Sequence, residues 1–159
     1  MTDRKSLVLA PLPGCEPEIG RWLRAMEDVR HSLKSKLEGT SQRLLDWKMD
    51  GRESIGNLLY HIAFVEADWL YVDILQSEWA PGIRALFPYE ERNTQGSLTQ
   101  VQGESLETHL HRLDQVRAAF LSHLRPMDLP DWRQPRVLEK YDVTPEWVVY
   151  HLIEHESHH

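Results

Sequence analysis

The sequence predicts an all-α protein, a four-helix bundle that forms a single domain over residues 1–159. Apolar residues recur at intervals of three and four in four separate segments, which is the spacing of one face of a helix. No segment shows the alternation of a half-buried strand. The length is that of one ordinary domain, and four amphipathic helices bury their apolar faces most simply against one another.

The first predicted helix covers residues 19–37. Pro17 suits its first turn, where a missing N–H costs nothing, and Gly39 can end it. Its apolar stripe consists of Ile19, Trp22, Met26, Val29, Leu33 and Leu37. The polar stretch 40–53 that follows contains Asp50-Gly51, a dipeptide typical of turns.

Ser54 can cap a second helix that runs to about Gln76. Its apolar stripe consists of Ile55, Leu58, Leu59, Ile62, Val65, Trp69 and Val72. Residues 77–104 cannot form one regular element, because they contain several helix breakers. These are Pro81, Gly82, Pro88, Gly96 and Gly103. Since this crossover is long for a compact domain, we expect it to cross the end of the bundle or to line a functional site.

Ser105 begins a third predicted helix, which stops before Pro126. Its apolar stripe consists of Leu106, Leu110, Leu113, Val116, Phe120 and Leu124. After a proline-marked loop, a fourth helix begins with an N-cap, a first-turn proline and a first-turn acid, namely Thr144, Pro145 and Glu146.

Composition excludes several classes of partner. Lys and Arg number 18 and Asp and Glu 25, a net charge of −7, which disfavours nucleic acid. The most apolar long stretch, residues 55–75, contains four ionisable residues, so we expect no membrane span. The run at residues 7–10 is too short for a signal peptide. The single cysteine, Cys15, suits a reducing compartment, and we expect a cytoplasmic protein.

The chain has nine histidines, and four of them fall in its last nine residues. On the fourth predicted helix, the apolar line through Val148 and Leu152 continues with His155 and His159. Residues four apart on a helix have Cβ atoms about 5 to 6 Å apart, and two histidines so placed can bind one metal ion. Spacing alone leaves open whether His151 pairs with His155 instead.

A third ligand must come from another helix, and His61 is the best candidate because it lies at the edge of the second helix's apolar stripe. A lone histidine at a core edge is more often a packing residue. Three inward imidazoles without a metal, however, would each need a buried hydrogen-bond partner. The remaining histidines are interpreted as surface residues: His31, His109, His111, His123 and His158. Candidate acceptors for the N–H groups of the ligands are Glu66, Asp68, Glu154 and Glu156.

The chain resembles the DinB family, metal-binding four-helix proteins that include bacillithiol S-transferase-like members. The resemblance is carried by Ser-Ile-Gly-Asn-Leu-Leu-Tyr-His-Ile-Ala at 54–63, by Thr-Pro-Glu-Trp-Val-Val-Tyr-His-Leu-Ile-Glu-His-Glu-Ser-His-His at 144–159, and by Trp47 before the Asp-Gly turn. It implies an up-down-down-up bundle, often a homodimer, with a divalent metal held by three histidines. Carried over to this sequence, the ligands are His61, His155 and His159.

One departure from the family pattern concerns His159. Family members usually continue past the last histidine with Arg-Gly-Gln and further helix, whereas this sequence ends at that histidine. Chain ends fray, so we expect packing to be needed to hold this ligand in place.

The predicted chemistry follows from the ligand set. Three neutral imidazoles leave the charge of a divalent ion uncancelled and one position open, so the ion acts as a Lewis acid and favours the deprotonated form of a bound thiol. Imidazole suits Zn, Ni, Fe and Cu. The resemblance implies activation of a low-molecular-weight thiol for transfer to an electrophile, or isomerisation of a small metabolite.

The leading hypothesis is therefore a metal-dependent thiol S-transferase, a homodimer that acts on a small thiol and an electrophile. No protein general base stands out. We expect residues 77–104, Trp47 and Trp79 to shape the second-substrate pocket. The alternatives are a non-catalytic, stress-linked, dimeric metal-binding bundle and a metal-dependent hydrolase.

Overall fold

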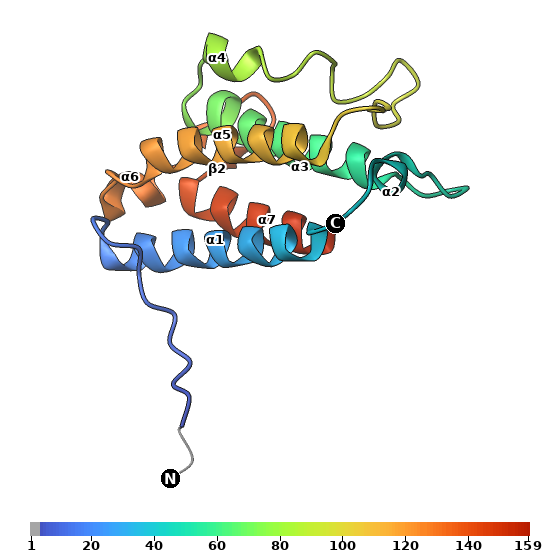
Figure 1. Cartoon of the computed structure of the whole chain (residues 1–159). Coiled ribbons are helices and arrows are strands. Elements are labelled where there is room, and N and C mark those ends of the chain that lie inside the picture. The colour runs from blue at the N-terminus through green and yellow to red at the C-terminus, as the bar shows by residue number, and fades with distance from the viewer. Residues whose placement is uncertain (1–3) are drawn as a thin grey trace.

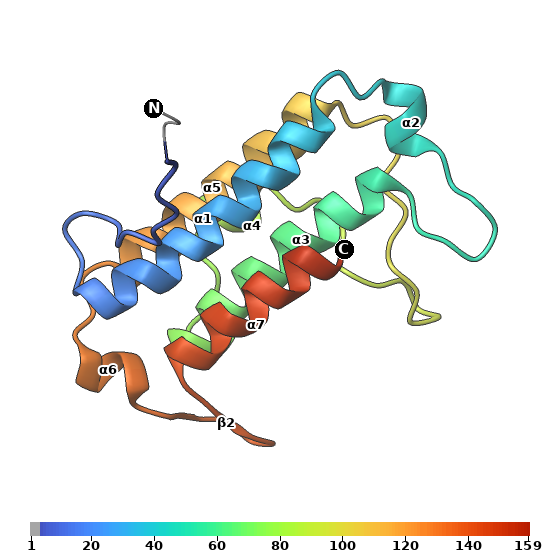
Figure 2. The same ribbon diagram turned by 90° about the horizontal axis from the view of Figure 1, so that it is seen from below.

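The computed structural model describes residues 4–159 and is mostly helical, as predicted. Its four long helices are α1 (Pro17–Leu37), α3 (Ile55–Asp68), α5 (Leu106–Leu124) and α7 (Pro145–His158). They form two layers, with α3 packed mainly on α5 and α1 mainly on α7 (Figure 1). Seen from below, α7 lies alongside α3 (Figure 2), and the two helices are in contact.

The predicted helix starts are confirmed by side chains that cap them. The hydroxyl groups of Ser54, Ser105 and Thr144 accept hydrogen bonds from the backbone N–H of the third residue of α3, α5 and α7, respectively. These bonds satisfy donors that the first helical turn leaves without a partner. At the other end of α1, Gly39 adopts a φ of 75°, the left-handed conformation that commonly follows a helix.

Several short elements were not predicted. The second predicted helix corresponds to α3 followed by a π-helical stretch, η1 (Trp69–Ile74). The predicted end near Gln76 is therefore close to the observed end at Ile74. The connections contain α2 (Gln42–Asp46), α4 (Pro81–Arg84) and α6 (Leu129–Arg133). An antiparallel pair, β1 (Arg136–Val137) and β2 (Asp142–Val143), precedes α7. Elements of two to six residues are too short to show a periodicity.

The core contains residues from all four predicted apolar stripes. Its buried members include Ile19, Met26, Leu37, Leu59, Ile62, Leu113, Val116, Phe120, Leu124, Val148 and Leu152. Val72, in contrast, lies on the predicted stripe but is 43% exposed, because it belongs to η1, where the helical periodicity changes. Among the described residues, no helix combines the length and the apolar character that a membrane span needs.

Four buried charged residues, one from each long helix, meet in the core; we call them the buried ion network. Arg30 of α1 and Arg117 of α5 each pair with both Glu66 of α3 and Glu156 of α7. The N···O distances are 2.6 to 3.0 Å. The interpretation of Glu66 and Glu156 as acceptors for histidine N–H groups is therefore wrong, since both carboxylates are occupied by arginines.

Residues 77–104, the connecting segment, lie against α3. The Tyr60 hydroxyl donates to the carbonyl of Tyr89 at 2.6 Å and accepts from the same residue's N–H at 3.0 Å. Further along, the N–H of Val101 donates to the Asn57 side chain at 2.8 Å. These bonds hold the connecting segment over the face of α3 that carries His61.

Candidate metal site

His61, His155 and His159 lie together in the structure, and we call them the histidine cluster. Each offers a ring nitrogen, and the three nitrogens lie within 4.8 Å of one another. The Nε2 atoms of His61 and His155 are 3.0 Å apart. The ring centroids of His155 and His159 are 4.6 Å apart, and those of His61 and His159 are 5.1 Å apart.

The cluster forms because α3 and the C-terminal turn of α7 lie side by side. His155 and His159 are four residues apart, so their rings project from the same side of α7. The N–H of His159 donates to the carbonyl of His155 at 3.2 Å, so His159 stays at the end of the helix. The neighbouring Glu156 ties the same turn to α1 and α5 through the buried ion network.

The nitrogens of His61 and His155 have the separation that a divalent ion requires. Two imidazole nitrogens bound about 2.0–2.1 Å from one ion are roughly 2.9 to 3.4 Å apart, for coordination angles between a right angle and the tetrahedral angle. The separation between His61 and His155, 3.0 Å, falls in this range. His159 is exposed, and its ring faces the other two.

The protonation states also suit a metal. Burial, followed by the neighbouring His61 and His159, lowers the pKa of His155 to about 4. Burial and His61 likewise lower the pKa of His159. At neutral pH both rings are therefore uncharged, and the neutral ring is the form that binds metal ions.

Glu91, in the connecting segment, orients His61. Its Oε1 lies 2.8 Å from His61 Nδ1, and this contact with His61 is the main cause that lowers the pKa of Glu91. An ionised carboxylate at this place keeps the His61 proton on Nδ1 and leaves the Nε2 lone pair directed at the cluster. No sequence pattern identifies this residue; the only signal is the unusual length of the connection that carries it.

Comparison with protein-family models gives one match, to the DinB superfamily, over residues 25–159. The chain belongs to the DinB superfamily. The match covers most of α1, all of the other three long helices and the whole histidine cluster. A search of curated proteins gave no match.

The other proposed acceptors in this DinB protein do not touch the cluster histidines. Asp68 accepts a hydrogen bond from Trp79 and has a pKa raised mainly by burial. Glu154 is exposed on α7. The acceptor that the sequence could not identify, Glu91, therefore replaces the four candidates taken from the helices.

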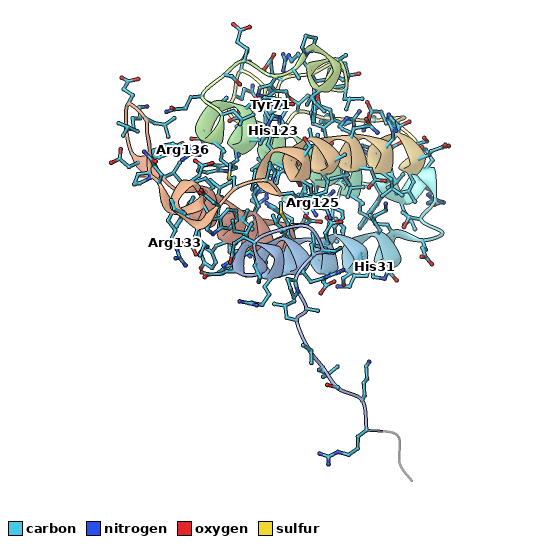
Figure 3. All side chains as sticks on the ribbon, turned by 90° about the vertical axis from the view of Figure 1, so that its left-hand side faces the viewer. His31, Tyr71, His123, Arg125, Arg133 and Arg136 are labelled. Atoms are coloured by element: carbon cyan, nitrogen blue, oxygen red, sulfur yellow. The ribbon has the colours of Figure 1, made fainter. Side chains whose placement is uncertain are left out.

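His151, the alternative partner of His155, lies outside the cluster. Its ring stacks on Trp147, with centroids 4.9 Å apart and planes 10° from parallel. Four of the five histidines interpreted as surface residues are exposed, namely His31, His111, His123 and His158. Figure 3 labels His31 on α1, and His123 beside Tyr71, with ring centroids 6.4 Å apart.

The prediction of a surface position is wrong for the fifth, His109, which is only 1% exposed. Its Nε2 lies 3.3 Å from the point where a Cβ on Gly56 would be, so the glycine lets α5 approach α3 closely. Burial lowers the pKa of His109. Charged neighbours in the sequence had suggested a solvated position, but one of them, Arg112, is itself buried and lies 3.3 Å from His109 Nδ1.

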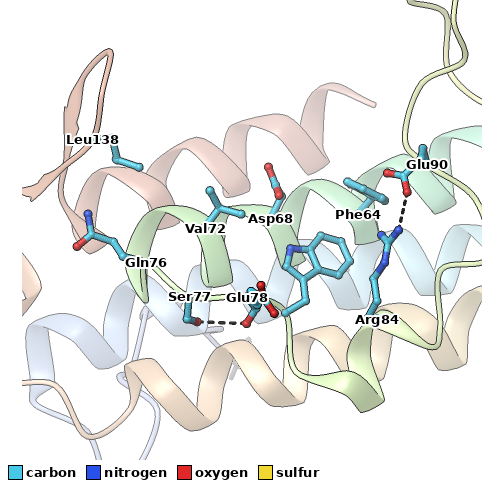
Figure 4. Close-up of a pocket in the computed structure, with 10 residues that line it drawn as sticks. Phe64, Asp68, Val72, Gln76, Ser77, Glu78, Arg84, Glu90 and Leu138 are labelled. Carbon is cyan, nitrogen blue, oxygen red and sulfur yellow. Dashed lines mark hydrogen bonds and ion pairs between the residues drawn. The ribbon is translucent and has the colours of Figure 1, made fainter.

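A groove of about 830 Å³ is lined mainly by residues of α3, η1 and the connecting segment in this DinB protein (Figure 4). Phe64 and Asp68, one and two turns after His61, form one wall, and Trp79 and Glu90 of the connecting segment line it too. The Trp79 ring packs against Phe64 with centroids 4.8 Å apart. Trp79 lines this groove, whereas Trp47 is 55% exposed and does not line it.

Proposed function

We propose that this protein is a divalent-metal-dependent enzyme, a thiol S-transferase whose metal ligands are His61, His155 and His159. The observation that carries the proposal is the convergence of three ring nitrogens within 4.8 Å, from two helices, in a chain of the DinB superfamily. When bound, the ion would supply Lewis acidity that favours the thiolate form of a small thiol.

The chain's own residues would prepare this chemistry. Glu91 holds a proton on His61 Nδ1, and burial keeps His155 neutral at the pH of a cell. The groove would receive the electrophile, whose apolar part can pack on Phe64 and Trp79. Zn, Ni and Fe all suit a set of imidazole donors.

The same proposal includes the topology of the bundle, the oligomeric state of the protein and its location in the cell. The colours in Figure 2 progress in one direction along α1 and α7 and in the other along α3 and α5, which supports an up-down-down-up bundle. We propose a homodimer, which sedimentation at several concentrations tests, and a cytoplasmic location, which suits a chain with one unpaired cysteine.

The first experiment is elemental analysis of protein purified without a nickel column. We expect one ion of Zn, Ni or Fe per chain in the wild type and its loss in His155→Ala. The matched control is His151→Ala, which removes an imidazole one turn away on the same helix and should retain the ion. Equal metal contents in the two variants would overturn the proposed ligand set.

The second experiment tests the reaction. We expect metal-loaded protein to lower the pKa of a low-molecular-weight thiol and to speed its transfer to a model electrophile, and expect His61→Ala to do neither. If metal binds but only ester hydrolysis is accelerated, the protein is a hydrolase. If metal raises the melting temperature without either activity, the bundle is a non-catalytic metal-binding protein.

A further inference from the structure

Three aromatic side chains surround a second hollow, of about 440 Å³, which we call the aromatic hollow. Trp69 comes from η1, Trp147 from the first turn of α7, and Tyr141 directly precedes β2. The Trp69 ring is tilted by 57° to Trp147 and by 49° to Tyr141, with centroids 5.5 and 6.2 Å apart. The rings are therefore not stacked in parallel, and they line the hollow from different elements.

The rings remain accessible although they are large. Trp147 is 45% exposed and Tyr141 is 48% exposed. Leaving such surface in water forgoes much of the stabilisation that burial of an aromatic side chain provides. A concave place with apolar walls and a few polar groups is typical of a small-molecule site.

Two of the three rings are held by contacts outside the hollow. Trp147 stacks on His151, and the Tyr141 hydroxyl donates to Asp73 at 2.5 Å. This hydrogen bond is the main cause that raises the pKa of Tyr141 to about 12, so the phenol stays protonated. Donation to a carboxylate also makes the ring more electron-rich, which strengthens its attraction for a cation.

The side chains that line the hollow are apolar, polar or acidic. The residues that line it include one carboxylate, Asp142, and no cationic side chain. Asp73 lies behind Tyr141, and Asp68 is close enough to contribute to the raised pKa of that tyrosine. Aromatic rings backed by carboxylates favour a poorly hydrated cation over an anion or a neutral molecule.

We propose that Trp69, Tyr141 and Trp147 form an aromatic cage that binds the quaternary ammonium group of a small cation. The hollow has the size of a small-molecule pocket, and rings that surround an alkylated ammonium are the recurring way in which proteins recognise it. Binding in the cage does not require a metal in the histidine cluster, so it can be tested independently of the proposed function.

The position of the cage suggests a use for the bound cation, and this step rests on the proposed function. Trp147, His151, His155 and His159 are spaced four apart along α7, and Trp147 and His155 are about 12 Å apart along the helix axis. A substrate of that length with an ammonium head could occupy the cage and reach the histidine cluster.

The test uses the full chain, freed of metal with chelator, and isothermal titration calorimetry. We expect choline and tetramethylammonium to bind, and expect 3,3-dimethylbutan-1-ol, the neutral analogue of choline with the same shape, to bind at least about tenfold more weakly. Equal binding of the neutral analogue would overturn the proposal. So would retention on phosphatidylcholine vesicles without binding of free choline, which would indicate a lipid surface instead.

Variants locate the site. Trp147→Ala and Tyr141→Ala should each weaken choline binding about tenfold or more, and both replace exposed side chains, so the fold should tolerate them. The matched control is Trp47→Ala, which removes another exposed tryptophan that does not line the hollow and should leave binding unchanged. If Trp147→Ala instead dissociates a dimer, and wild type binds no choline, the hollow is covered by a second copy and the cage proposal is wrong.

Discussion

At the scale of single residues, Glu91 illustrates how a side chain in a connection can set the chemistry of a histidine on a helix. Its carboxylate lies 2.8 Å from His61 Nδ1, and such partners commonly change metal affinity by 10- to 100-fold. We expect Glu91→Ala to weaken metal binding by about that factor, measured by competition with a chromogenic chelator. The adjacent Glu90 pairs with Arg84 instead, so Glu90→Ala should bind like the wild type; equal losses in both would contradict this role.

His109 makes a second residue-scale prediction, which concerns pH. Burial lowers the pKa of its folded form below the ordinary 6.5. As the pH falls below 6.5, the unfolded chain takes up a proton that the folded chain excludes, so the free energy of unfolding decreases. The decrease continues as the pH falls toward the folded-state pKa, by at most about 1.4 kcal/mol for each pH unit.

The measurement is urea denaturation at pH 7 and at pH 5 with chelator present. We expect His109→Gln to lose less stability between the two pH values than the wild type does. His111→Gln, on the same helix but exposed, should match the wild type. The effect would be refuted by a His109→Gln variant whose pH dependence is unchanged.

At the scale of elements, the buried ion network joins all four long helices. Arg117 is buried. Burial disfavours the charged form of its guanidinium group, whereas the carboxylates of Glu66 and Glu156 stabilise that form. Removal of one member of a buried ion pair commonly costs about 3–5 kcal/mol, because the partner is left unpaired. We expect Arg117→Met to lower the free energy of unfolding by that amount in chemical denaturation.

A surface ion pair between α1 and α5, the two helices that carry the arginines of the network, is the matched control. Lys34 of α1 and Asp114 of α5 are 2.9 Å apart and partly exposed, and such pairs contribute about 0–1 kcal/mol. Lys34→Met should therefore change stability little. Replacement of all four network residues by apolar ones should restore much of the loss, since no charge then stays unpaired. A quadruple variant less stable than Arg117→Met would contradict this reasoning.

The same elements show how far the sequence can predict the structure. The long helices could be predicted because their signals are local in the sequence. These signals are the capping residues Ser54, Ser105 and Thr144 and the spacing of the apolar residues. Glu66 and Glu156 could be located on helices, but their arginine partners lie up to 126 positions away in the chain, and no local pattern identifies them. His61, His155 and His159 could be proposed from spacing, whereas Glu91 depends on the path of an irregular segment.

At the scale of the whole molecule, the histidine cluster connects the two layers. His61 lies on α3 in one layer, and His155 and His159 lie on α7 in the other. An ion held by all three would therefore tie the layers at the end of the molecule where the chain of α7 stops. An ion that binds only the folded state stabilises it by mass action, about 2.7 kcal/mol when its free concentration is 100 times the Kd.

For a domain of this size, we expect that stabilisation to raise the melting temperature by about 5–10 °C, measured by calorimetry with the ion and again after chelation. His155→Ala should melt at one temperature under both conditions, because two of the three donors cannot replace the set. His151→Ala should keep the full difference, since its ring stacks on Trp147 outside the cluster. If chelation lowers the melting temperature of wild type and His155→Ala equally, the ion binds elsewhere and the cluster does not join the layers.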